Sequence, residues 1–205
     1  RYSYVASAGF FLFAGYMHES LFKTKYLKII YFVGIMLYAV LLISFTRERC
    51  EVWNNSISLW DDMIKKHPSV EMAYNNRGLA KVDAKKYDDA IADYNKAITI
   101  NKKYYKSYNN MGVAKILSGK HQDAISDFTK AIEIDTGFIA AYQNRAKARQ
   151  DINDYNNALA DYTKLLSLNI KSSEVYGGIG WAKYSLKEYN SSIENYNKAI
   201  SLNPS

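Results

Sequence analysis

Apolar and polar residues between residue 70 and the end of the chain follow the spacing of amphipathic helices, and the pattern recurs every 34 residues. One column of the pattern is aromatic and contains Tyr74, Tyr108, Tyr142 and Tyr176. A column of small residues lies four positions later and contains Gly78, Gly112, Ala146 and Gly180. Two further columns combine small residues at Ala90, Ala124, Ala158 and Ser192 with aromatic ones at Tyr94, Phe128, Tyr162 and Tyr196. Because these columns stay in register, the sequence predicts four copies of one helical unit.

Each copy predicts two antiparallel helices joined by a short turn. The expected helices span 70–83 and 87–100, 105–117 and 121–134, 139–151 and 155–168, and 173–185 and 189–201. The four units are then 69–104, 105–138, 139–172 and 173–205. A helix pair of this kind cannot bury its apolar face alone and is stabilised by its neighbours. We therefore expect an all-α solenoid in which most column tyrosines serve packing rather than a ligand site.

The period of 34 residues and the order of aromatic and small positions resemble the tetratricopeptide-repeat signature. The resemblance implies a helix-turn-helix solenoid whose first helices line a concave surface. It also implies that this surface binds a protein or an extended peptide. The first functional hypothesis is therefore a scaffold for protein–protein interaction.

The same resemblance places a set of side chains from the first helices on the concave surface, exposed to solvent. The candidate peptide-binding residues are Asn75, Asn76, Leu79, Asn109, Asn110, Val113, Gln143, Asn144, Lys147 and Trp181. Asn76, Asn110 and Asn144 form a column that resembles the asparagine ladder of superhelical repeat proteins. Such amides donate and accept at once, which suits the backbone of a peptide; the alternative is that they bond across the helix pair. Asn75 stands where the carboxylate clamp of chaperone-binding members requires a lysine, so that partner is not expected.

The first fifty residues have a different pattern, with two long uncharged stretches. Residues 2–17 contain no charged side chain, and Ile29–Thr46 is a second charge-free stretch of 18 residues. A membrane-spanning helix needs about 20 apolar residues, with about 17 as the lower limit. The two stretches predict a two-helix transmembrane hairpin over residues 1–46, which would anchor the chain in a membrane through residues 2–46. A signal peptide is disfavoured because a second hydrophobic helix follows it, and buried helices of a soluble protein are a weaker alternative because the second stretch is apolar all round.

Residues 47–68 contain no glycine and no proline before Pro68. Counted back by one period, Trp60 and Ser56 fall in the aromatic and small columns. We therefore interpret 52–65 as the second helix of a half repeat, whose partner is the end of the apolar stretch. The solenoid would then continue directly from the membrane helix. An independent juxtamembrane amphipathic helix is the alternative.

Charge and composition narrow the function further. The net charge of +7 is concentrated beside the apolar stretches, since residues 1–50 hold six basic and two acidic side chains. This distribution is typical of a membrane flank and not of a nucleic-acid-binding surface. Lys23, Lys25 and Lys28 favour a cytoplasmic connector, which would leave the repeats in the periplasm or a lumen. Cys50 is the single cysteine, and no paired-histidine or phosphate-binding glycine motif occurs, so we expect no metal site, no cofactor and no catalytic residue in this chain.

The opening residues carry a second resemblance. Arg1-Tyr2-Ser3-Tyr4-Val5-Ala6-Ser7-Ala8-Gly9 resembles the Arg-Tyr-x-Tyr-x-x-Ser-x-Gly stretch of transmembrane-and-tetratricopeptide O-mannosyltransferases and their bacterial relatives, which have a GT-C type membrane fold. The continuation from Arg47 to Pro68 also resembles that family's join between membrane and repeats, and in such proteins the repeats face the lumen or periplasm. The resemblance implies a second functional hypothesis, the C-terminal part of a polytopic protein O-glycosyltransferase whose repeats position the acceptor polypeptide. The family's catalytic acidic residues belong to earlier loops.

Overall fold

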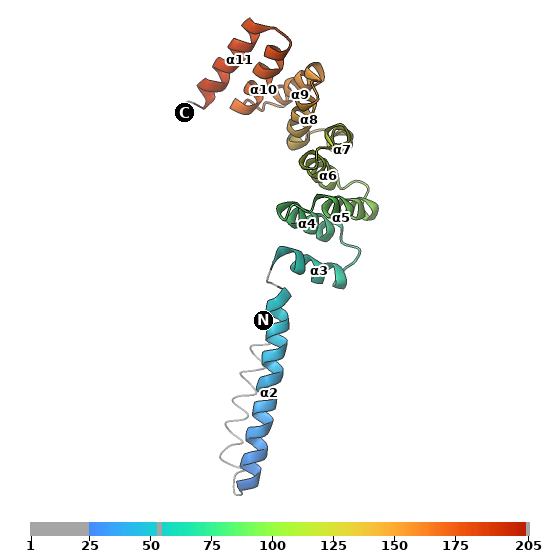
Figure 1. Ribbon diagram of the computed structural model, residues 1–205, viewed down its shortest axis with the longest axis vertical. Helices are drawn as coiled ribbons and strands as arrows, with labels where there is room; N and C mark the ends of the chain where they lie inside the picture. Colours follow the sequence, from blue (N-terminus) through green and yellow to red (C-terminus); the bar gives the residue numbers. More distant parts are fainter. Residues whose placement is uncertain (1–24, 53–54, 204–205) are drawn as a thin grey trace. The chain divides into compact units, whose positions relative to one another are not determined.

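The computed structural model describes residues 25–52 and 55–203, and all of their regular structure is α-helical (Figure 1). The chain divides into two compact units, Arg1–Asn54 and Asn55–Ser205. The prediction of an all-α fold is therefore confirmed for the described residues.

In the first unit, helix α2 spans Lys25–Val52. Its segment Ile29–Thr46 has a mean hydropathy of 2.4, and none of it is buried. By length and composition, α2 is therefore long and apolar enough to cross a membrane. The Ser44 hydroxyl donates to the Val40 carbonyl at 3.0 Å, which satisfies this polar group inside the helix.

The predicted hairpin of residues 1–46 is described only in its second half. Its first helix lies outside the described residues. Its second helix continues past Thr46 to Val52, so the boundary predicted at residue 46 is not a helix end.

Helix α3 (Ser56–Lys66) opens the second unit and packs against α4 (Glu71–Asp83). The Asn55 side chain caps α3 by accepting a hydrogen bond of 2.9 Å from the backbone N–H of Ser58. The helix predicted over 52–65 therefore starts later, because its cap is Asn55. The place of α3 before the first repeat agrees with a half repeat. Its direct continuation from α2 stays a prediction, because the link between the two units lies outside the described residues.

Four helical hairpins follow in the second unit. Their helices are α4 with α5 (Tyr87–Ile100), α6 (Tyr105–Leu117) with α7 (His121–Ile134), α8 (Ile139–Asp151) with α9 (Tyr155–Ser167), and α10 (Ser173–Ser185) with α11 (Tyr189–Leu202). These bounds agree with the predicted ones to within one residue at each end. The prediction of a solenoid of four repeats is confirmed.

The turn inside each hairpin uses one residue with a positive φ. These residues are Lys85, Gly119, Asn153 and Lys187, with φ of 59°, 80°, 62° and 64°. At the first turn, the N–H of Lys86 donates to the Lys81 carbonyl at 2.8 Å, which forms a Schellman-type cap, and the other three turns repeat this bond. The turn geometry is therefore constant although glycine, which adopts a positive φ most easily, occupies only one of the four positions.

Small residues allow the aromatic column to lie against the backbone of the neighbouring helix. A Cβ added at Gly78 would lie 2.6 Å from the Tyr94 ring, and one at Gly112 would lie 2.6 Å from the Phe128 ring. Both aromatic side chains are fully buried. Tyr94 therefore serves packing, as predicted.

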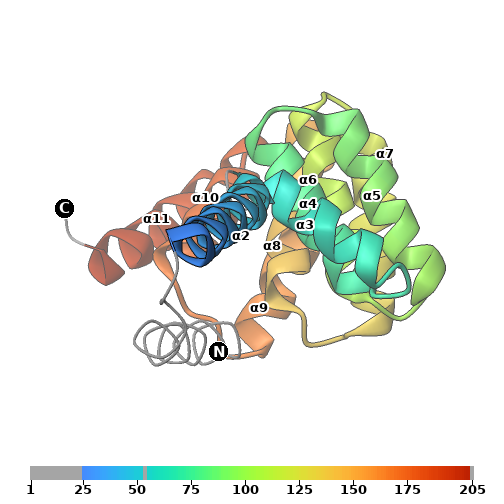
Figure 2. The ribbon, with the colours of Figure 1, turned by 90° about the horizontal axis from the view of Figure 1, so that it is seen from below.

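The first helices of the repeats form the inner side of the solenoid. Helix α4 contacts α6, α6 contacts α8 and α8 contacts α10, whereas no comparable contact joins consecutive second helices in the described part of the chain. Figure 2 shows α5 and α7 together on one side of α4 and α6. Because the first helices approach one another more closely, the face that they form is the concave one. We call this face of α4, α6, α8 and α10 the inner surface.

Candidate peptide-binding surface

The predicted binding residues differ in how far the inner surface exposes them. Leu79 and Trp181 are each 42 % exposed, and Lys147 is exposed as well. The partly buried residues are Asn76, Asn110, Val113, Gln143 and Asn144. Asn75 and Asn109 are only 4 % and 7 % exposed, so the expectation that these two side chains face solvent is wrong.

The two buried asparagines belong to a continuous chain of side-chain amides that crosses three first helices. Asn144 of α8 donates to Asn109 of α6 at 2.9 Å, and Asn109 donates to its neighbour Asn110 at 3.4 Å. Asn110 then donates to Asn75 of α4 at 3.0 Å, and Asn75 donates to Asn76 at 3.2 Å. At every step the Nδ2 of one amide meets the Oδ1 of the next. We call these five residues the amide chain.

The amide chain changes the interpretation of the asparagine column. The sequence allowed these side chains either to bind a peptide backbone or to bond across a helix pair. In the structure Asn110 and Asn144 donate to the first helix of the preceding repeat, whereas Asn76 accepts from Asn75 of its own helix. The two ends of the chain, Asn76 Nδ2 and Asn144 Oδ1, have no partner among the described residues.

The position directly before the asparagine column accepts fewer hydrogen bonds from the next repeat at each successive repeat boundary. It is occupied by Asn75, Asn109 and Gln143. Asn75 accepts two hydrogen bonds from the next repeat, the second of them from the Ser107 hydroxyl at 3.0 Å. Asn109 accepts one. Gln143, the corresponding residue of α8, accepts none from the described residues. The number of hydrogen bonds that this position accepts from the next repeat therefore falls from two to one to none, although Gln150 of α8 still bonds to the Gly178 carbonyl of α10.

A pocket opens where Gln143 lacks a partner. Its volume is about 520 Å³, and it is lined by Gln143, Asn144, Lys147, Gln150, Tyr162, Glu174 and Val175. Three of the predicted binding residues come together here, beside residues of α8, α9 and α10 that the prediction left out. The sequence does contain a signal for Gln150, because this residue is polar where the first two repeats have Val82 and Ile116.

Tyr162 fixes one wall of this pocket. Its hydroxyl donates to Gln150 Oε1 at 2.9 Å, and Gln150 Nε2 donates to the Gly178 carbonyl at 3.0 Å. Burial raises the pKa of Tyr162 to about 12, and the nearby carboxylates of Asp161 and Asp151 raise it as well. The hydroxyl is therefore a neutral donor at neutral pH, which keeps the ring in place against α10.

Trp181 of α10 adds an aromatic side chain to the inner surface. Its ring meets the ring of Tyr155 edge-on, with centroids 5.5 Å apart and an angle of 73° between the planes. The contact orients the indole while leaving much of it exposed. Aromatic side chains held in this way offer a large contact area with little further loss of conformational entropy.

Buried ion pairs fix the helix pairs that carry the pocket and the amide chain. In repeat three, Arg145 donates to both oxygens of Asp161 at 3.0 and 2.7 Å, and Arg149 adds a contact of 2.6 Å. In repeat one, Arg77 donates to Asp93 in the same way at 2.8 and 2.5 Å. A two-pronged pair of this kind restricts how the first helix sits on the second. The hydrogen bonds to Asp93 raise the pKa of Arg77 above its usual value, and the charge of Asp93 adds to this effect.

Repeat two lacks this arginine, since Met111 occupies the column of Arg77 and Arg145. Its carboxylate, Asp127, contacts Lys115 at 2.7 Å in an ion pair without regular hydrogen-bond geometry. Burial raises the pKa of Asp127 above its usual value, and Lys115 offsets this only in part. The repeats therefore share the turn inside each helix pair while differing in the electrostatics of these pairs.

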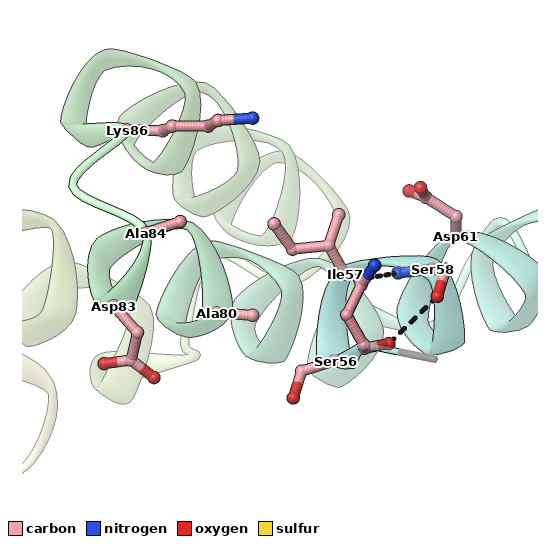
Figure 3. Close-up of a pocket in the computed structure, with 9 residues that line it drawn as sticks. Ser56, Ile57, Ser58, Asp61, Ala80, Asp83, Ala84 and Lys86 are labelled. Atoms are coloured by element: carbon pink, nitrogen blue, oxygen red, sulfur yellow. Dashed lines mark hydrogen bonds between the residues drawn. The ribbon is translucent and has the colours of Figure 1, made fainter. Parts of the chain in front are cut away.

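A second pocket, of about 490 Å³, lies beside the first turn of α3 and the end of α4 (Figure 3). Of its acidic lining residues, Asp61 is held by Arg77 at 2.7 Å. Most of the other lining side chains are serine and alanine. None of the predicted binding residues lies in this pocket, so it supports a binding site less well than the pocket at Gln143.

Comparison with models of protein families matches the repeat region. One model described as tetratricopeptide repeat matches residues 72–104, and a second model of the same description matches 105–137, 139–169 and 173–205. Comparison with curated proteins gives no match.

Solved structures share the fold of this chain. MamA is 21 % identical with a TM-score of 0.66, and the alignment covers 71 % of this chain and 85 % of MamA. MamA from Desulfovibrio magneticus RS-1 is 19 % identical with a TM-score of 0.62, covering 65 % and 76 % of the two chains. YrrB, a TPR protein with an unusual peptide-binding site, is 16 % identical with a TM-score of 0.64, covering 80 % and 82 %. At such identities the similarity shows a shared fold.

Proposed function

The chain belongs to the tetratricopeptide-repeat family, and we propose on that premise that its inner surface binds an extended segment of a partner polypeptide. The observation that carries this proposal is the pocket at Gln143, which lies on the same surface as the exposed side chains of Leu79, Lys147 and Trp181. Interaction with other proteins is what the family and the shared fold support. The choice of the inner surface as the binding face rests on the pocket and on these exposed side chains.

The inner surface combines the two kinds of group that peptide binding needs. Gln143, the Nδ2 of Asn76 and the Oδ1 of Asn144 have no partner among the described residues and can bond to a peptide backbone. Leu79 and Trp181 offer apolar contacts. A mainly apolar surface with a few well-placed polar groups is the usual character of a ligand site. The peptide-binding site of YrrB, which has the same fold, supports the proposal without indicating a position.

A displayed library of random peptides tests this proposal on the full chain in detergent micelles. Peptides retained by the chain should bind at least about 10-fold more weakly to Leu79→Glu, because a carboxylate would then be desolvated in the contact. Gln122→Glu, which adds the same charge at an exposed position of α7, should leave their affinity unchanged. Equal affinities for the chain and for Leu79→Glu would contradict binding on the inner surface.

We also propose that α2 anchors the chain in a membrane and that the repeats lie outside the cytoplasm. The apolar side chains of α2 are exposed along the helix, with Ile30 at 68 % and Leu37 at 66 %. A helix with apolar side chains exposed on every side is unfavourable in water and favourable in a bilayer. Lys25 and Lys28 at its start favour a cytoplasmic location for that end.

A single-cysteine experiment tests the anchor and its orientation together. In a Cys50→Ser background, Lys130→Cys places a thiol at an exposed position of α7. A membrane-impermeant maleimide should label it in intact cells. Labelling only after permeabilisation would contradict the orientation, and recovery of the chain in the soluble fraction would contradict the anchor.

The glycosyltransferase hypothesis rests on the opening residues, which lie outside the described part of the chain, and on the sequence of the stretch from Arg47 to Pro68. No feature of the described residues favours it over a binding scaffold. It stays a prediction of the sequence resemblance, and binding of a polypeptide by the repeats is compatible with it.

A further inference from the structure

The pocket at Gln143 lies at the repeat boundary where the amide chain stops. At the boundary between repeats one and two, Asn110 donates its Nδ2 to Asn75 at 3.0 Å. At the next boundary, Asn144 donates its Nδ2 to Asn109 at 2.9 Å. At the third boundary, no described side chain donates to Gln143, which corresponds to Asn75 and Asn109. The side-chain carbonyl at this position therefore accepts an amide donor from the next repeat at the first two boundaries and none at the third.

Two residues of α10 account for the missing donors. Gly178 occupies the column of Asn110 and Asn144 and has no side chain. Val175 occupies the position from which Ser107 donates its hydroxyl at the first boundary, and a valine cannot donate. The third boundary therefore lacks both inter-repeat donors.

An asparagine cannot simply replace the glycine at this boundary. A Cβ at Gly178 would collide with the ring of Tyr162. The hydrogen bond of 2.9 Å to Gln150 holds that ring in place. The packing of Tyr162 against α10 therefore excludes an asparagine side chain at residue 178.

Two exposed charges line the pocket from opposite helices. Lys147 belongs to α8 and Glu174 to α10. Neither forms an ion pair among the described residues. An acidic ligand would gain from Lys147 but would be repelled by Glu174, and a basic ligand would meet the reverse. The pair therefore favours a group that is neutral overall and has a strong dipole.

We propose that this pocket binds a carboxamide side chain, asparagine or glutamine, of the bound polypeptide, in the role that Asn110 and Asn144 have at the two preceding boundaries. The ligand amide nitrogen donates to Gln143 Oε1 or Glu174, and its oxygen accepts from Lys147. A volume of about 520 Å³ also admits the peptide backbone on both sides of that side chain. The inference rests on the proposed binding of a polypeptide at the inner surface and specifies one residue of that polypeptide.

Four blocked pentapeptides with a fluorescent label test the inference on the full chain in detergent micelles. They have the form Gly-Gly-X-Gly-Gly, with glutamine, glutamate, lysine or leucine as X. Fluorescence polarisation should show the glutamine peptide binding about 10-fold more tightly than the other three, because only it satisfies the polar groups of the pocket. Equal affinities for glutamine and leucine peptides would overturn the inference.

Three variants separate the pocket from the rest of the surface. Gln143→Leu should reduce the preference for glutamine over leucine to nearly 1-fold, and Glu174→Gln should improve binding of the glutamate peptide severalfold by removing the repulsion. Gln122→Leu, at an exposed position of α7, should change no ratio. A glutamine preference that survives Gln143→Leu would overturn the inference.

Displayed peptides distinguish failure of this inference from failure of the proposed function. If those peptides bind in a manner sensitive to Leu79→Glu while no glutamine preference exists, the inference is wrong and the binding surface stands. If neither the displayed peptides nor the pentapeptides bind, both are wrong.

Discussion

At the boundary between repeats one and two, Asn75 is 4 % exposed and accepts two hydrogen bonds from the next repeat. At the boundary between repeats three and four, the corresponding Gln143 accepts none and lines a pocket of about 520 Å³. The first helices at the two boundaries have the same length, but the turn from α9 into α10 contains Asn169 with a φ of 63°, and the turn from α5 into α6 contains no residue with a positive φ. The two boundaries therefore differ in a few side chains and in the backbone of the turn that joins their repeats.

The comparison shows how one repeat pattern serves both stability and binding. In a solenoid each repeat is stabilised mainly by its immediate neighbours. A boundary that is already tied by hydrogen bonds has little capacity left for a ligand. A boundary without these bonds has unpaired polar groups, and the neighbouring boundaries and the buried ion pairs hold its walls in place.

Removing a carboxylate from the buried ion pairs should have the largest effect, because these pairs hold the frame that both boundaries share. Asp161→Asn leaves Arg145 and Arg149 without their carboxylate, and we expect a loss of about 3–5 kcal/mol in the free energy of unfolding. Asp127→Asn is the matched control, because its only ion-pair partner among the described residues is Lys115, which can reach solvent. Urea unfolding followed by circular dichroism measures both. Similar losses in the two variants would contradict the different electrostatics of repeats two and three.

Truncating the corresponding amides at the two boundaries compares them directly. Asn75→Ala leaves the buried donor of Ser107 and the partly buried donor of Asn110 without an acceptor, which should cost about 1–3 kcal/mol. Gln143→Ala removes a side chain without inter-repeat bonds and should change stability by less than about 0.5 kcal/mol. The same unfolding measurement checks both variants. A large loss for Gln143→Ala would mean that the third boundary is not open.

The two neighbouring glycines of α10 test whether packing against Tyr162 excludes a side chain at residue 178. Gly178→Ala places a methyl group against the Tyr162 ring and should destabilise the chain by about 1–3 kcal/mol. Gly177→Ala meets no atom within 4 Å and should stabilise the helix by up to about 1 kcal/mol. Thermal unfolding of the two variants measures the opposite signs. If Gly178→Ala stabilised the chain, a clash with the Tyr162 ring could not explain why residue 178 is not an asparagine.

The smallest expected effect is the pH dependence that Asp127 contributes to repeat two. Burial raises the pKa of this carboxyl in the folded state, so the folded state binds its proton more tightly than the unfolded state does. Its contribution to stability is therefore present below the unfolded pKa and is lost as the pH rises through the folded pKa. The free energy of unfolding of the chain, relative to that of Asp127→Asn, should therefore fall as the pH rises from the unfolded pKa to the folded pKa of Asp127. A difference independent of pH would show that Lys115 fully compensates for burial.

The helix bounds could be predicted from the sequence because each depends on residues close together in the chain. The small and aromatic columns specify which faces of a helix pair meet, and Gly78 against Tyr94 lies where the columns indicate. The start of α3 at Ser56 was missed, since the Asn55 cap acts on the first turn alone. Part of the site was also predictable, as Gln143, Asn144 and Lys147 line one pocket.

The sequence by itself determined the period, the four helix pairs and the candidate face, because local spacing and repetition encode them. Only the tertiary structure decided that Asn75 and Asn109 are buried and that five amides form one chain. Asn110 and Asn75 are 35 residues apart, and whether their side chains meet depends on how far each repeat is rotated against the next. That rotation results from the packing of all the helices at a boundary. It is also why the residues that bond at the first boundary correspond to residues that line a pocket at the third.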